Sequence, residues 1–234
     1  MGILIIDTCG DVGWVIYAEN NIPLHIYQNT NSKTYLEWLH QTIATLFLQI
    51  NKNNINAIAA TNGPGSYTGV RIGVAAAQGL AYTLKKPLIA LNIFDVYYHM
   101  FKAEPNITSI IPMIDARRME VFTKAFYLDG TTEYKETALI LQKDIILPLV
   151  TNKIPLFCGN GSHKLTALFN KTYELNINNK QYNQTHLTKL AYIHYYNNQL
   201  IYNAILSINY CKNFNELGQE NWTQNESKQF STNQ

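Results

Sequence analysis

Charged residues are scarce in this chain. Its 18 lysines and arginines and 16 aspartates and glutamates make up 15% of the 234 residues and leave a formal net charge of +2. So few charges do not build the broad basic surface by which many nucleic-acid-binding proteins attract their ligand. Any contact with nucleic acid must therefore be local or shared with a partner.

Cysteines are few and far apart. Cys9, Cys158 and Cys211 are the only three, and none belongs to a CxxC pair that would indicate a zinc site or a redox centre. We therefore expect no metal site and a reduced, cytoplasmic protein. No apolar run approaches the roughly 20 residues that cross a bilayer. The run at residues 3–6 is too short for a signal peptide and has no basic flank, so no membrane contact is expected.

Hydrophobic residues make up 47% of the chain, which is enough for a sizeable core. In the first half, the pattern predicts three strands that form a meander, and then alternating helices and strands. Such an order is typical of a mixed α/β sheet with helical crossovers. The expected strands lie at residues 3–6, 14–18, 23–27, 57–61 and 88–91, and the expected helices at 36–50 and 67–84.

The second half begins as the first does. In both, a strand ends in an aspartate, Asp7 or Asp115, and runs into a meander, with further strands predicted at 121–127, 134–140 and 156–158 and a long helix at 186–200. We interpret this repetition as two similar lobes, the first at residues 1–102 and a second, smaller one at 103–212. Residues 213–234 are polar and predict a partly disordered tail.

The segment from Gly63 to Gly73 joins a predicted strand to a predicted helix and admits two interpretations. As a phosphate loop it is incomplete, because it has no lysine of the GxxxxGK[ST] motif and Thr68 stands where GxGxxG has its third glycine. As a packing surface it is better supported, since glycine or alanine recurs at every fourth position through Gly69 and Gly73. That small face would pack on the protein's own sheet, or serve both the sheet and a partner helix.

The run GPGSYTGVRIGVAAAQGLA at residues 63–81 resembles the signature of the TsaB (YeaZ) family, whose usual form is GPGSFTGLRIG followed by an alanine-rich helix. Residues 5–8 resemble the opening strand of that family. The run PMIDARRMEVF at residues 112–122 resembles its second signature. The resemblance covers residues 1–212. It departs from the family at residues 32–34, where a His-Ser-Glu segment is usual.

The resemblance implies a duplicated ASKHA fold, which is actin-like, sugar-kinase-like and RNase H-like, with two lobes of mixed sheets flanked by helices. It also implies a non-catalytic subunit that binds and activates the catalytic relative TsaD. With the ATPase TsaE and tRNA, that assembly transfers a threonylcarbamoyl group to the adenosine beside the anticodon. The chain's own contact with tRNA is expected to be indirect.

We expect the partner interface on the first two helices, and a homodimer through the same surface when the chain is alone. The predicted interface residues are Tyr35, Leu36, Leu39, Ile43, Thr68, Gly69, Val70, Arg71, Gly73, Val74 and Ala77.

The strand-end aspartates have two interpretations. In active ASKHA enzymes such carboxylates position a magnesium nucleotide in the cleft between the lobes. Alternatively, each caps the turn that follows its strand, which we favour in a non-catalytic family. We expect no tightly bound cofactor, and at most a weak nucleotide at the partner interface. The residues of a degenerate nucleotide site would be Asp7, Thr8, Gly10, Asp115, Gly159 and Gly161.

Two other functions remain open. An active ASKHA-fold kinase or metallopeptidase would need a phosphate loop or a metal site. However, no two of the six histidines are four residues apart, as the HxxxH motif of the catalytic relative requires. Ser66 does not lie in a GxSxG elbow, and Cys9 has no basic neighbour in the sequence. A self-dimerising regulatory protein is the second alternative.

Overall fold

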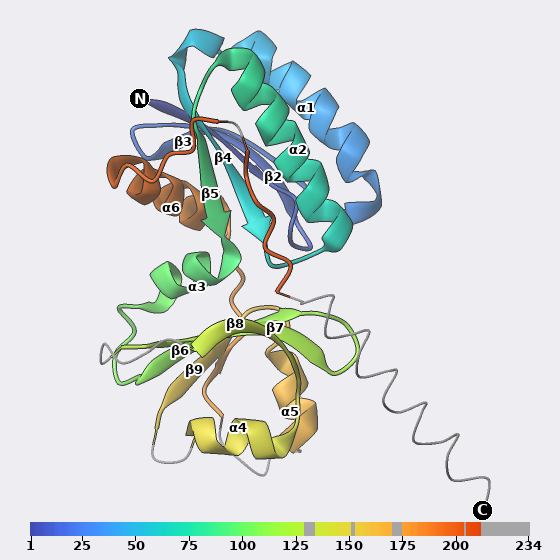
Figure 1. Cartoon of the computed structure of the whole chain (residues 1–234), viewed down its shortest axis with the longest axis vertical. Coiled ribbons are helices and arrows are strands. Elements are labelled where there is room, and N and C mark those ends of the chain that lie inside the picture. The colour runs from blue at the N-terminus through green and yellow to red at the C-terminus, as the bar shows by residue number, and fades with distance from the viewer. Residues whose placement is uncertain (129–133, 151–152, 170–174, 204, 212–234) are drawn as a thin grey trace, which may run out of the picture.

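The computed structural model describes residues 1–128, 134–150, 153–169, 175–203 and 205–211. Two five-stranded sheets lie one above the other in Figure 1, with helices around them. No helix within the described ranges combines the length and the apolar character that a membrane crossing requires. The polar tail predicted at residues 213–234 lies outside the described residues.

The first sheet has the strand order β3-β2-β1-β4-β5. The strands β1 to β3 form the expected antiparallel meander, and β4 and β5 continue the sheet in parallel to β1. Its central strand, β1, is buried along its whole length, which explains its uninterrupted apolar sequence. The strands are β1 Gly2–Asp7, β2 Gly13–Glu19, β3 Ile22–Asn29, β4 Ile55–Gly63 and β5 Leu88–Asn92.

The second sheet repeats this topology with the order β10-β9-β6-β7-β8. Its meander β6-β7-β8 is antiparallel, and β9 runs parallel to β6, as β4 does to β1. The two similar lobes predicted from the repeated strand-Asp-meander pattern are therefore confirmed, as is the duplicated ASKHA fold that the family resemblance implied. The strands are β6 Ser109–Asp115, β7 Glu120–Tyr127, β8 Tyr134–Ile140, β9 Pro155–Cys158 and β10 Ile177–Asn178.

Helices cover both faces of the first sheet. On one face, α1 and α2 pack against alternate residues of β1, Leu4 and Ile6. On the other face, α6 packs against the intervening residues, Ile3 and Ile5. The helix α3 lies between the sheets and contacts both, while α4 and α5 cover the far face of the second sheet. The helices are α1 Tyr35–Gln49, α2 Tyr67–Leu84, α3 Ile93–Phe101, α4 Lys143–Val150, α5 His163–Phe169 and α6 Gln184–Tyr196, with short 3₁₀ turns at Ser32–Thr34 and Lys52–Asn54.

The division of the chain at residue 102 needs a correction. Residues 184–211 were expected in the second lobe, but α6 packs on the first sheet, and Ile201 forms a bridge with Leu88 of β5. The segment 205–211 then runs beside α2, where the backbone of Asn209 donates to the carbonyl of Asn62 at 2.7 Å. The first lobe is thus completed by the C-terminal part of the chain.

Candidate functional site

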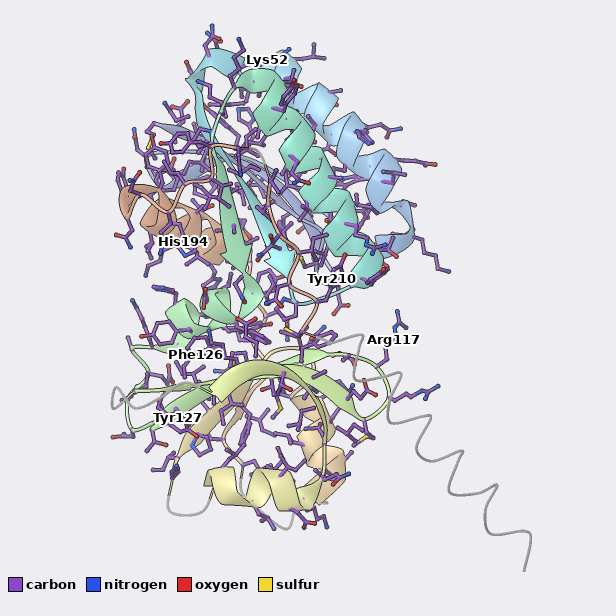
Figure 2. The ribbon with its side chains drawn as sticks, viewed as in Figure 1. Lys52, Arg117, Phe126, Tyr127, His194 and Tyr210 are labelled. Carbon is purple, nitrogen blue, oxygen red and sulfur yellow. The ribbon has the colours of Figure 1, made fainter. Side chains whose placement is uncertain are left out.

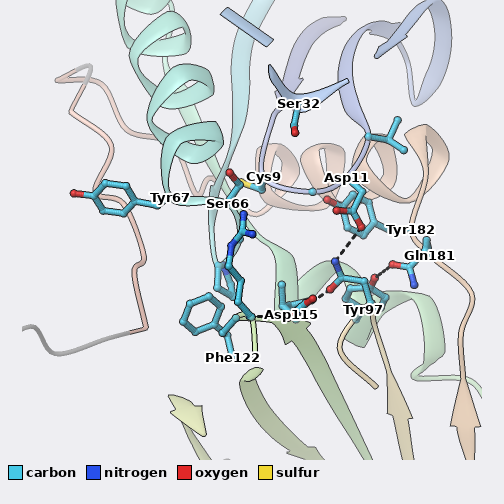
Figure 3. Close-up of a pocket in the computed structure, with 18 of the residues that line it drawn as sticks. Cys9, Asp11, Ser32, Ser66, Tyr67, Tyr97, Asp115, Phe122, Gln181 and Tyr182 are labelled. Atoms are coloured by element: carbon cyan, nitrogen blue, oxygen red, sulfur yellow. Dashed lines mark hydrogen bonds between the residues drawn. The ribbon is translucent and has the colours of Figure 1, made fainter. Parts of the chain in front are cut away.

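A cleft of about 620 Å³ separates the two lobes. Its upper wall comes from the loop after β1 and from the first residues of α2, and its lower wall from the turn between β6 and β7 (Figure 3). The lining includes Gly10, Asp11, Ser66, Tyr67, Thr68, Tyr97, Asp115, Arg117, Phe122, Asn160 and Tyr182. Of the six residues predicted for a degenerate nucleotide site, Gly10 and Asp115 line this cavity.

Asp7 lies beneath this cleft and is fully buried. Its carboxylate accepts hydrogen bonds from the Thr61 hydroxyl at 2.6 Å, the Cys9 amide at 2.8 Å and the Tyr182 hydroxyl at 2.8 Å. Burial raises the pKa of Asp7 above its usual value, and these three hydrogen bonds oppose the rise. The carboxylate is thus enclosed by its own chain.

Tyrosine side chains fill the space through which a ligand would reach Asp7. The Tyr182 ring meets the Tyr97 ring edge-on at 5.6 Å, and the Tyr97 hydroxyl donates to Gln181 at 2.7 Å. A Cβ atom at Gly10 would lie 2.8 Å from the Tyr182 hydroxyl, so this loop has no room for a side chain. A magnesium nucleotide bound to Asp7 would have to displace Tyr182.

Asp115 lies at the opposite wall and is paired as well. Its carboxylate forms an ion pair with the Lys164 amine and accepts a hydrogen bond from the Arg117 amide at 2.6 Å. Partial burial acts to raise the pKa of Asp115, but the hydrogen bonds from Lys164 and Arg117 and the charge of Lys164 outweigh it and hold the pKa below its usual value.

Both aspartates cap the turn that follows their strand, because each accepts a hydrogen bond from the amide two residues later. The other members of the predicted nucleotide site also make internal contacts. The Thr8 hydroxyl donates to the Gly69 carbonyl at 2.6 Å. A Cβ atom at Gly159 would lie 2.5 Å from the Met113 carbonyl of β6, and one at Gly161 would lie 2.9 Å from the Val121 side chain of β7. Within the described ranges, no three histidine, cysteine, aspartate or glutamate side chains come together as a metal site.

The interface predicted on α1 and α2 requires a correction. Most of its residues face the first sheet of the same chain and are buried, so their side chains do not reach a partner. Cβ atoms at Gly69 and Gly73 would lie 2.0 and 2.4 Å from atoms of Thr8, which shows that these glycines allow α2 to approach β1. The buried residues are Tyr35, Leu39, Ile43, Gly69, Val70, Gly73, Val74 and Ala77.

The exposed side of these helices carries a different set of residues. Of the predicted interface, Leu36, Thr68 and Arg71 lie at the surface. On α2, Ala75 and Gly79 are exposed too, and a Cβ atom at Gly79 would meet nothing within 4 Å. We define the outer helix face as the exposed residues Leu36, His40, Ala44 and Leu48 of α1 and Thr68, Ala75 and Gly79 of α2, together with the half-buried Ile72.

Several site residues were not predicted from the sequence. Tyr182 and Lys164 reach the aspartates from segments 175 and 49 residues away, and a lone tyrosine or lysine in the sequence carries no signal of such a contact. Tyr210, which accepts a hydrogen bond from Arg71 at 2.9 Å, likewise gave no signal of this contact in the sequence. The contacts of Tyr182 and Tyr210 depend on the return of the C-terminal part of the chain to the first lobe, whereas the Lys164–Asp115 pair forms within the second lobe.

The family model described as "TsaD: tRNA N6-adenosine threonylcarbamoyltransferase" matches residues 26–209. The "tRNA threonylcarbamoyladenosine biosynthesis protein TsaB" of Escherichia coli K12 is 29% identical over 62% of this chain and 64% of the relative. Its Haemophilus influenzae counterpart is 31% identical over 51% of each chain. The chain thus matches less than two thirds of the length of these relatives.

The fold is similar to that of YeaZ from Pseudomonas aeruginosa, with a TM-score of 0.70, 20% identity and coverage of 89% of this chain and 99% of that one. Both lobes are therefore shared. Because the family model spans most of the chain and TsaB proteins of several bacteria are among its curated relatives, the chain belongs to the family of that model, in its TsaB (YeaZ) group.

Proposed function

We propose that this chain is a non-catalytic subunit in the biosynthesis of threonylcarbamoyladenosine in tRNA. In this role it binds a TsaD-type catalytic relative through the outer helix face and holds it in an active state, with TsaE and tRNA as further components. The names of the curated relatives support the pathway. The match of a TsaD family model to this chain supports a partner of the same fold.

The observation that carries the docking proposal is Gly79. A glycine inside a helix costs roughly 1 kcal/mol relative to alanine, and no neighbour within the chain needs the missing side chain. With Thr68, Ile72 and Ala75 along the same line of α2, it leaves a shallow surface that another helix can approach closely. Because a partner of the same fold has equivalent helices, the two helix pairs can meet about a pseudo-twofold axis.

The cleft supports a non-catalytic role. The two strand-end carboxylates that would position a magnesium nucleotide are already engaged by Tyr182 and Lys164. The alternative of a small-molecule kinase or metallopeptidase has no such support from the described residues. The alternative of a self-dimerising regulator would use the same outer helix face, and it is separated from the present proposal by the tests below.

Size exclusion with light scattering tests the docking, on the chain alone and mixed with TsaD from the same organism. We expect a homodimer that converts to a one-to-one complex, and Gly79→Arg should abolish both without lowering the thermal stability of the monomer, because arginine has a higher helix propensity than glycine. Ile154→Arg, at an exposed position of the second lobe, is the matched control. Variants of Val70 or Gly73 are unsuitable, because both residues are buried.

A chain that stays monomeric and ignores TsaD would contradict the proposal. Turnover of ATP by the chain alone would favour the kinase alternative. Normal threonylcarbamoyladenosine levels in cells that lack the protein would favour the regulator.

A further inference from the structure

All three arginines of the chain lie at the mouth of the interlobe cleft. Arg117 lines the cleft from the lower lobe, and Arg118 follows it in the same turn. Arg71, on α2, stacks on Tyr67, which lines the cleft from the upper lobe. Figure 2 shows Arg117 and Tyr210, the partner of Arg71, on the same flank of the molecule on either side of the cleft.

The guanidinium of Arg71 is held in one orientation. It lies 3.8 Å from the centre of the Tyr67 ring and 5.6 Å from that of Tyr210, and its Nε atom donates to the Tyr210 hydroxyl at 2.9 Å. These contacts use one of its five N–H donors and leave the terminal nitrogens for a ligand. Tyr67 itself is 48% exposed.

Arg117 and Arg118 adopt positive φ angles of 72° and 48°, a backbone conformation that residues other than glycine and asparagine rarely take. The turn is held by the hydrogen bond from the Arg117 amide to Asp115. It leaves both guanidinium groups exposed and, among the described residues, without a hydrogen bond or an ion pair.

The acidic residues of the cleft do not neutralise these arginines. Asp115 is paired with Lys164, and Asp11 accepts a hydrogen bond from the Asn160 amide group at 3.1 Å. In the part of the chain that the structure describes, no carboxylate lies within ion-pair distance of Arg71, Arg117 or Arg118. The mouth of the cleft therefore carries positive charge beside a half-exposed aromatic ring.

We propose that this arginine mouth, formed by Arg71, Arg117, Arg118 and Tyr67, binds a strand of RNA directly. Arginine pairs with phosphate through two parallel hydrogen bonds. The exposed part of the Tyr67 ring, which carries Arg71 on one face and has the Tyr210 ring tilted against it at 5.3 Å, offers an aromatic surface to a base. The proposal rests on the proposed function, because it assigns to this chain a direct contact with the tRNA of the assembly. A single stacked arginine and a two-arginine turn suit a local contact, in keeping with the low net charge of the chain.

The test measures binding of unmodified tRNA to the complex of this chain with TsaD, over a range of salt concentrations. Arg71→Gln and Arg117→Gln should each weaken binding roughly three- to tenfold, the effect of losing one charge-assisted contact. Each should lower the slope of log K against log salt concentration by about one. Arg71→Lys keeps the charge and should keep the slope while it loses affinity, because lysine does not form the paired contact.

Lys85→Gln is the control, since it removes a charge at the opposite end of the same helix. Thermal unfolding and light scattering show whether each variant folds and still binds TsaD. Wild-type tRNA affinity and salt slope in both Arg→Gln variants would overturn the inference and leave the docking proposal intact. Arginine-dependent binding of ATP without binding of tRNA would also overturn it. If no complex with TsaD forms, the docking proposal fails. The RNA inference is then tested on the chain alone, where Arg71→Gln and Arg117→Gln must weaken tRNA binding and lower its salt slope in the same way.

Discussion

At the scale of single residues, the enclosed carboxyl group of Asp7 predicts a pH effect. Burial raises its pKa, so the folded chain binds this proton more tightly than the unfolded chain does. The group therefore favours the folded state at low pH, and this contribution is lost as the pH rises through the folded pKa. Asp7→Asn removes the titration and keeps an oxygen for Thr61 and Cys9.

Urea unfolding across pH should show that Asp7→Asn gains stability relative to wild type as the pH rises. The difference should become constant below about pH 3, where the group is protonated in both states. Asp144→Asn, at an exposed position of α4, is the control. If the free energy of unfolding changed with pH in the same way in Asp7→Asn and in wild type, the raised pKa of Asp7 would be contradicted.

Asp115 predicts the opposite pH dependence, because its pKa is lowered. The stability that its ion pair with Lys164 contributes is present above the unfolded pKa, about 4, and is lost as the pH falls through the folded pKa. Lys164→Met should destabilise the chain by about 1 kcal/mol at pH 7, a value reduced because the Asp115 side chain is 38% exposed. The deficit should shrink in acid, and the part due to the lost hydrogen bond to the Glu120 carbonyl should remain. Lys33→Met, at an exposed position, should show neither effect.

At the scale of elements, two glycines of α2 predict effects of opposite sign. Gly73→Ala places a methyl group 2.4 Å from the Thr8 hydroxyl in a buried contact and should cost about 1–3 kcal/mol. Gly79→Ala places it in open space and should stabilise the helix by roughly 0.5–1 kcal/mol. Urea unfolding of the two variants measures both. A loss of stability in Gly79→Ala would show that the outer helix face is already occupied.

At the scale of the whole molecule, Glu136 of β8 joins three segments. Its carboxylate accepts hydrogen bonds from Asn92, at the N-terminus of α3, and from Asn209, in the C-terminal segment, and it pairs with Lys124 at 3.6 Å. Glu136→Ala should loosen the contact between the lobes. Hydrogen exchange should rise at the start of α3 and at residues 205–211, with the far face of the second sheet unchanged. Glu104→Ala, at an exposed position, is the control.

Local pattern was enough to predict α2 with its observed bounds, because Ser66 begins the helix with a side-chain hydrogen bond to Gly69 and the Lys85-Lys86-Pro87 run ends it. It was not enough for α3, which the sequence did not predict. That helix is only nine residues long and mostly apolar, and in so short a segment periodicity alone does not separate a helix from a buried strand.

The sequence by itself determined the strands other than β10, the helices α1, α2 and α6, the duplicated lobes and the family, since all of these depend on local residue pattern and short motifs. Only the tertiary structure decided which side of α1 and α2 faces outward, because an apolar stripe is the same whether it meets its own sheet or a partner. It also placed α6 on the first sheet, enclosed Asp7 behind Tyr182 and gathered the three arginines at one cleft. Such contacts join residues far apart in the chain, and their energies appear only when the backbone has brought them together.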